Sequence, residues 1–116
     1  MDVGETLEVR SRAEWRSWLA KHHQDRKEIW LLYNRKRADR GGIAYEESVE
    51  EALCYGWIDG QVKGVDDRRY AGRFTPRRPR GNWSASNIAR VKRLVDEGRM
   101  TEAGLAVIPT ELKVGQ

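Results

Sequence analysis

Six arginines and no acidic residue lie between Arg68 and Arg80, directly after a glycine-bounded GWIDG motif. A guanidinium group is planar and permanently charged, and it can donate two parallel hydrogen bonds to a phosphate or a carboxylate. Tyr70 and Phe74 lie among these arginines, and aromatic faces beside guanidinium groups also suit stacked nucleobases. The segment 52–83 is therefore predicted to bind an anion.

The predicted ligand-binding residues lie in the GWIDG motif, in the arginine-rich stretch and in the helix expected after it. They are Trp57, Asp59, Lys63, Arg69, Arg73, Arg77, Arg78, Arg80, Trp83 and Asn87. Three roles are open for Asp59: an ion pair with an arginine such as Arg73 across a hairpin, a hydrogen-bond acceptor for the ligand, or a general base. A general base works with a nucleophile or a poised acid, and the sequence supplies neither. No catalytic residue is therefore predicted.

The start of the helix after Ser84 is a second reason to expect an anion here. Asn82, Ser84 and Asn87 lie near this helix N-terminus, where free amide donors and the helix dipole favour negative charge. Arginines from the preceding loop would reinforce such a site, over about residues 73–87. Trp83 either packs the start of the helix against the core or stacks on a base.

No metal and no cofactor are expected. His22 and His23 are adjacent, so on a helix they point about 100° apart, and the sequence has no further histidine. The sequence also has no glycine-rich phosphate loop. Cys54, the single cysteine, follows Ala52 and Leu53, which predicts a buried and inert thiol.

Hydrophobic periodicity and capping residues predict the elements that position these side chains. Ser11 with Glu14 forms a capping box for a helix that extends to about His22. Further helices are expected at 46–55, after Ser84, and from Thr101 to about 108, with a loop at 36–42. Strands are expected at 7–9, 28–35, 57–63 and 69–75, and the second of them should be central because it is apolar on both faces.

The strands 57–63 and 69–75 are predicted to form a β-hairpin. Period-two alternation would place Trp57, Asp59, Gln61 and Lys63 on one face. Residues 65–68 make a plausible turn, and Pro76 and Pro79 should end regular pairing after the second strand. The arginines would then decorate the hairpin and its exit loop.

These elements predict an α+β fold in which a small, mainly antiparallel sheet with a basic β-hairpin packs against three to four helices. A chain of 116 residues fits one domain, expected at 1–109 with a flexible tail at 110–116. The sequence has no apolar run of about 18 residues and no signal-like N-terminus. We therefore expect a cytoplasmic protein without membrane insertion.

The net charge of +4 conceals a concentrated positive segment. Eleven basic and four acidic residues lie between Val62 and Arg99, whereas the other residues include eleven basic and fourteen acidic ones. Such a distribution favours a polyanionic partner, with a merely solvated face as the alternative. Nucleic acid and a phosphorylated small molecule are the two ligand classes that fit.

Five segments within about residues 10–108 resemble the bacterial YdeI / OmpD-associated family, also labelled bacteriocin-protection proteins. They are EWRSWLAKHH, EIWLLYNRK, EEALCYGWIDGQ, RFTPRRPRGNWSASN and RLVDEGRMTEAGL. The resemblance implies a role in a stress or envelope-protection response and supplies no reaction. Longer members carry a further helical segment, so any activity of that segment is expected to be absent here.

The sequence favours binding over catalysis. The first hypothesis is a non-enzymatic anion-binding module in a bacterial stress or protection context, with nucleic acid or a phosphorylated ligand as its partner. The alternative is a protein-protein interaction module of the YdeI/OmpD-associated type, which would use exposed aromatic residues such as Trp30 or Tyr33. The third reading is an enzyme acting on an anionic substrate, with Asp59 as acid or base.

Overall fold

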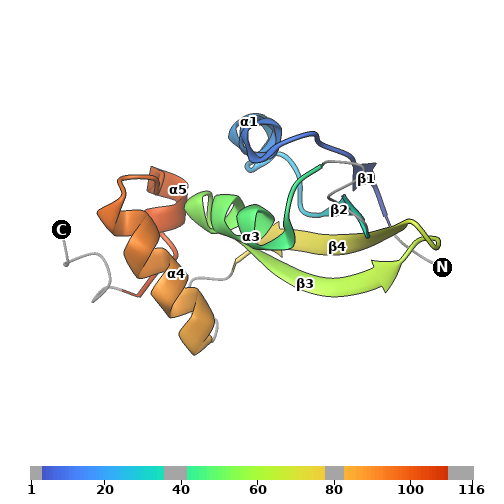
Figure 1. The fold of residues 1–116 in the computed structure, drawn as a ribbon. Coiled ribbons are helices and arrows are strands. Elements are labelled where there is room, and N and C mark those ends of the chain that lie inside the picture. Colours follow the sequence, from blue (N-terminus) through green and yellow to red (C-terminus); the bar gives the residue numbers. More distant parts are fainter. Residues whose placement is uncertain (1–3, 36–41, 78–82, 110–116) are drawn as a thin grey trace.

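The computed structural model describes residues 4–35, 42–77 and 83–109. Over these ranges the chain forms helices and one four-stranded sheet, which confirms the predicted α+β class (Figure 1). The elements are β1 (Thr6–Leu7), α1 (Arg12–His22), β2 (Ile29–Asn34), α3 (Tyr45–Cys54), β3 (Trp57–Gly64), β4 (Arg69–Pro76), α4 (Ala85–Asp96) and α5 (Glu102–Leu105).

Side-chain caps set the beginnings of three helices where the sequence predicted them. The hydroxyl oxygens of Ser11, Ser84 and Thr101 accept hydrogen bonds from backbone N–H groups three residues later. The helix that follows Thr101 is shorter than predicted, because it ends at Leu105. The first strand is also shorter and begins one residue earlier than expected.

The strand order is β1-β2-β4-β3, with β1 parallel to β2 and the other pairs antiparallel. β2 therefore lies inside the sheet, as predicted for the apolar segment 28–35. β3 and β4 form the predicted hairpin, in which the Asp66 carboxylate accepts hydrogen bonds from the backbone N–H groups of Arg68 and Arg69.

A β-bulge in β3 changes the face on which its later side chains lie. Asp59 is opposite Phe74 and Val62 is opposite Gly72, so two residues of β3 face Arg73 alone. The extra residue reverses the alternation, and Lys63 becomes the neighbour of Ala71. The prediction that Asp59 and Lys63 share a face is therefore wrong, because uninterrupted period-two alternation does not hold through the bulge.

One face of the sheet packs against α1 and α3. Trp15 and Leu19 of α1 lie in a core cluster with Ile29, Leu31 and Phe74, and the cluster also includes Tyr33, Ala52 and Trp57. α4 and α5 lie at the end of the molecule opposite the β3–β4 turn (Figure 1). The sheet thus has one face covered by α1 and α3. The alternate side chains of each strand project from its other face.

A second core cluster joins α3 to the C-terminal helices. Val49, Leu53 and Cys54 of α3 pack with Val91 and Leu94 of α4. Gly56 ends α3 with a φ of +76°, a conformation that favours glycine. Gly104 lies so close to the end of α3 that a Cβ atom there would come within 2.3 Å of the Cys54 carbonyl oxygen. Only glycine allows α5 to dock at this distance.

Some predictions fall outside the described ranges, including Arg78, Arg80, most of the loop at 36–42 and the tail at 110–116. Within the ranges that are described, no helix is both long and apolar enough to cross a membrane.

Candidate functional site

Three of the predicted basic residues lie on the sheet face opposite α1 and α3. Arg69 and Arg73 flank Ala71 along β4, and the bulge places Lys63 opposite Ala71 on β3. Lys63 Nζ lies 5.7 Å from the ring centroid of Trp30, which projects from β2 on the same face. We refer to Lys63, Arg69 and Arg73 as the basic row.

Acidic residues from other parts of the chain accompany the basic row. Arg73 pairs with Glu28, and Arg69 lies 3.7 Å from Glu8 and 3.8 Å from Asp66. Glu8 and Glu28 therefore reach these arginines from distant parts of the chain, although the arginine-rich segment itself has no acidic residue. The Arg73 and Glu28 side chains remain 41% and 36% exposed. Pairs this exposed contribute little to stability, so a more highly charged ligand can compete for the arginines.

Asp59 does not pair with Arg73. Its Oδ2 atom accepts a hydrogen bond of 2.6 Å from the hydroxyl of Tyr45, whereas Arg73 projects from the opposite face of the sheet. Burial raises the pKa of Tyr45, and the hydrogen bond and the charge of Asp59 raise it further. Tyr45 therefore remains a protonated donor at neutral pH, and this donor occupies one oxygen of Asp59.

Tyr45 belongs to a group of three tyrosines over Gly72. The Tyr33 ring stacks on Tyr70 with centroids 4.9 Å apart and lies 5.3 Å from the Tyr45 ring. A Cβ atom at Gly72 would come within 3.0 Å of the Tyr33 ring, so the glycine makes room for the group. The Tyr33 hydroxyl is hydrogen-bonded to Ser48 Oγ at 2.6 Å, and burial raises the pKa of Tyr33.

Trp30 and Tyr33 are not the exposed contacts that the interaction hypothesis requires. They are 3% and 2% exposed, because Lys63 lies over the Trp30 ring and Tyr33 packs in the core cluster that includes Trp15 and Leu19. Trp57 is also buried, at 1% exposure, and its indole nitrogen donates to the carbonyl of His23. None of these three aromatic residues can contact a partner in the folded protein.

At the start of α4, the predicted residues interact with one another and with the core. The Arg77 guanidinium lies 3.9 Å from the ring centroid of Trp83, and burial lowers the pKa of Arg77. Trp83 packs against the second core cluster. The side-chain oxygen of Asn87, which is buried, accepts a hydrogen bond from Arg90 at 2.8 Å. Trp83 therefore packs the start of α4 against the core, and the side chain of Asn87 bonds within its own helix.

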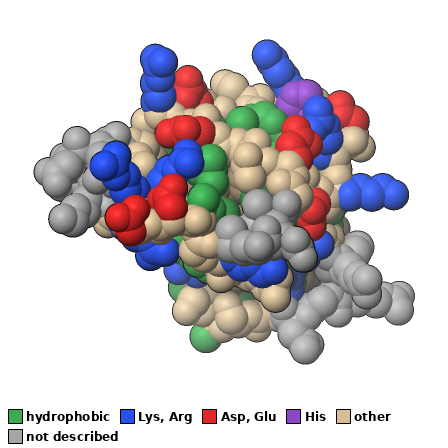
Figure 2. All heavy atoms as spheres, turned by 90° about the vertical axis from the view of Figure 1, so that its right-hand side faces the viewer, with side chains coloured by type: hydrophobic (Ala, Val, Ile, Leu, Met, Phe, Trp, Pro, Cys, Tyr) green, Lys and Arg blue, Asp and Glu red, His purple; other side chains and the backbone are tan. Residues whose placement is uncertain are grey.

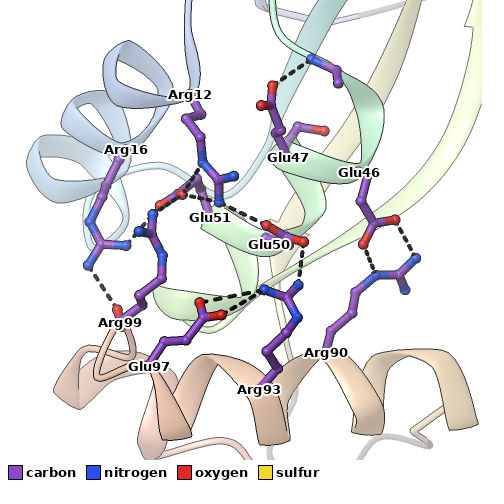
Figure 3. Close-up of polar contacts among 12 residues, drawn as sticks. Arg12, Arg16, Glu46, Glu47, Glu50, Glu51, Arg90, Arg93, Glu97 and Arg99 are labelled. Carbon is purple, nitrogen blue, oxygen red and sulfur yellow. Dashed lines mark hydrogen bonds and ion pairs between the residues drawn. The ribbon is translucent and has the colours of Figure 1, made fainter.

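A network of glutamates and arginines that the sequence patterns did not predict links α3 to α1, to α4 and to the loop after α4 (Figure 3). Glu51 is completely buried and accepts hydrogen bonds from Arg12, Arg16 and Arg99. The other pairs of the network are Arg12–Glu50, Arg93–Glu50, Arg93–Glu97 and a bidentate Arg90–Glu46. The sequence signal was the pair Glu46 and Glu50, which are four residues apart and share a helical face, with Glu51 next to Glu50.

Among the described residues, no group of three or more His, Cys, Asp or Glu side chains could hold a metal ion. A family model described as Domain of unknown function (DUF8412) matches residues 7–107. No curated protein matches the chain, and no solved structure matches it.

Proposed function

Because the chain belongs to the DUF8412 family, a domain family of unknown function, we propose its function from the geometry of the site. The proposed function is non-enzymatic binding of a polyanion to the basic row of Lys63, Arg69 and Arg73. The main observation behind this proposal is the bulge at Gly60 and Gln61, because it places Lys63 on the same sheet face as the two arginines.

The spacing of the basic row favours an extended ligand. Arg69 and Arg73 are four residues apart on a strand, which corresponds to about 13 Å, and Lys63 projects between them from the neighbouring strand. A compact phosphate ester would reach one or two of these cations, whereas a nucleic acid strand can place several phosphates along the row. We therefore favour nucleic acid over a phosphorylated small molecule.

The row can offer only a small positive area to a ligand, because Glu8, Glu28 and Asp66 lie beside its two arginines. On the face shown in Figure 2, basic and acidic side chains lie side by side, so that face presents no uniform positive surface. A phosphate that displaces Glu28 from Arg73 exchanges one anion for another and leaves the strand geometry intact. The resemblance to the YdeI / OmpD-associated family supports a bacterial, cytoplasmic stress or protection context as part of the proposal.

The test is fluorescence anisotropy of labelled DNA and RNA, single-stranded and duplex, over a series of salt concentrations. For a single strand, each lost phosphate contact should reduce the magnitude of the slope of log affinity against log salt by roughly 0.7. Lys63→Ala/Arg73→Ala should therefore reduce this slope by about 1.4. The matched control is Lys21→Ala/Lys92→Ala, which removes the same charge from the exposed surfaces of α1 and α4.

Equal salt-dependence slopes for the two double variants, or no binding at low salt, would show that the basic row is not a nucleic-acid site. A thermal-shift series with nucleotides and inorganic phosphate separates the two ligand classes, since a ligand that binds only the folded state raises its melting temperature. Stabilisation by these compact anions without binding of oligonucleotides would favour the phosphorylated small molecule. Arg77→Ala/Arg78→Ala then tests whether the site continues beyond β4.

A further inference from the structure

A groove of about 460 Å³ lies between α1 and the segment that precedes it. Leu7 and Val9 of this segment line one side of the groove, and Trp18 of α1 lines the other. Its volume is within the range of small-ligand sites, and its combination of apolar walls with a few charged groups is typical of them. The groove lies beside α1, and Glu8, which lines it, also lies 3.7 Å from Arg69 of the basic row.

The apolar wall of the groove is held in place by neighbouring rings. The indole of Trp18 stacks on Trp15 with centroids 5.5 Å apart and meets Trp57 edge-on at 5.8 Å. His22 packs against it from the next turn of the helix, at 5.1 Å. Trp18 is only partly buried, so it offers an apolar surface whose orientation is fixed before any ligand arrives.

The two ends of the groove carry opposite charges. Glu8 and Glu14 line the end at the first turn of α1, and Lys21 and His22 line the end at its last turn. Glu14 and Lys21 are seven positions apart in the chain, which is about 10 Å along a helix. A second, polar cavity of about 630 Å³ shares Glu8, Val9 and Glu14 with the groove and is also lined by Arg10, Asn34 and Gly42.

The existing contacts of these charged groups leave hydrogen-bonding capacity for a ligand. Glu14 accepts from the backbone N–H of Arg10, and Glu8 lies 3.7 Å from Arg69. An ionised carboxylate has about four acceptor positions, so each can still bind an ammonium group. His22 Nδ1 lies 3.2 Å from Asp25, and the Lys21 side chain is exposed.

We propose that this groove binds a short peptide with free termini, about three residues long, whose central side chain is apolar. Three extended residues span about 10 Å, which matches the separation of the charged ends. The N-terminal ammonium lies at Glu8 and Glu14, the C-terminal carboxylate lies at Lys21 and His22, and the central side chain contacts Trp18, Leu7 and Val9.

The test uses the tripeptide Ala-Leu-Ala, its N-acetylated form and its C-amidated form in calorimetric titrations. Blocking either terminus should weaken binding by about tenfold, the loss expected for one charge-assisted contact. In two-dimensional NMR spectra, the free tripeptide should shift the indole N–H signal of Trp18 more than that of Trp30, which lies outside the groove.

Charge variants assign each end of the peptide. Glu8→Gln/Glu14→Gln should weaken the free and amidated peptides but leave the acetylated peptide unaffected, and Lys21→Gln should spare only the amidated peptide. Lys92→Gln and Glu97→Gln, on α4 and just after it, are the controls and should change nothing. The proposal fails if free and blocked peptides bind equally, if no peptide binds, or if the controls have the same effect as the groove variants.

Discussion

The carboxylate of Asp59 shows how one residue can be committed to structure although its motif suggested chemistry. It lies on the sheet face toward α3, where the Tyr45 hydroxyl donates to it over 2.6 Å. A hydrogen bond to a charged group contributes about 1.5–3 kcal/mol when it is protected from water. Asp59 thereby fixes the N-terminal end of α3 to β3.

We expect Asp59→Asn to lower the free energy of unfolding by about 1–2 kcal/mol, because the amide accepts a weaker hydrogen bond than the carboxylate. Urea denaturation measures the change. Tyr45→Phe should cause a loss of similar size, and the double variant should lose less than the sum of the two because both changes remove one interaction. Strict additivity would mean that Asp59 and Tyr45 contribute independently.

Cys54 is a second residue whose environment decides its chemistry. It is completely buried in the second core cluster, and burial raises the pKa of its thiol. We expect native protein to resist a thiol-specific reagent and to react with one equivalent after denaturation. Absorbance of the released chromophore measures the reaction, and rapid labelling of folded protein would contradict the burial.

At the scale of elements, the glutamates of α3 join it to α1 and α4. Arg12 and Arg16 approach from α1, Arg90 and Arg93 from α4, and Arg99 from the loop after α4 (Figure 3). Glu51 is the buried centre of this arrangement. If it loses its charge, three guanidinium groups lose their common anion at once.

We expect Glu51→Gln to reduce the free energy of unfolding by about 3 kcal/mol, the lower end of the cost of breaking a buried ion pair, because the three arginines are partly exposed. Glu97→Gln is the control, since it removes the same charge from an exposed pair with Arg93 and should have a much smaller effect. Chemical denaturation compares the two variants, and equal losses would contradict a special role for Glu51.

Lowering the pH should weaken the contacts between Glu51 and its three arginines. Burial alone would raise the pKa of Glu51, but hydrogen bonds from Arg16, Arg12 and Arg99 outweigh it, and the pKa lies below its usual range. The stabilisation is therefore complete above about pH 4.3, where unfolded glutamate titrates, and is lost as the pH falls through the lower folded value. Denaturation midpoints over this range should fall less steeply for Glu51→Gln than for the wild type.

At the scale of the whole molecule, two core clusters share one helix. α3 contributes Ala52 to the cluster with the sheet and α1, and it contributes Val49, Leu53 and Cys54 to the cluster with α4. Neither cluster can lose α3 without exposing apolar surface in the other. The two clusters should therefore unfold together.

This cooperativity can be measured with one probe in each cluster. In Trp83→Phe, the remaining tryptophans lie on α1, β2 and β3, so their fluorescence reports on the sheet and α1, while pulse labelling of Cys54 reports on the second cluster. We expect the same denaturant midpoint for both probes. A Cys54 transition at lower denaturant would show that α4 and α5 detach first.

The sequence by itself determined the local elements and the fold class. Ser11, Ser84 and Thr101 began their helices as predicted, because a cap depends on residues three positions apart. The apolar segment 28–35 became an interior strand, and the hairpin formed between the two predicted strands. The anion-binding assignment of the arginine-rich segment stays a prediction, and Arg78 and Arg80 lie outside the described residues.

Only the tertiary structure decided which charged groups meet. The bulge that separates Lys63 from Asp59 depends on the register between β3 and β4, and the partners of Arg73 and Glu51 lie 35 to 48 residues away in the chain. The burial of Trp30 likewise depends on a distant residue, because Lys63 of β3 lies over its ring. Caps and periodicity arise from interactions between near neighbours, whereas the face and the partner of a side chain depend on how distant segments pack.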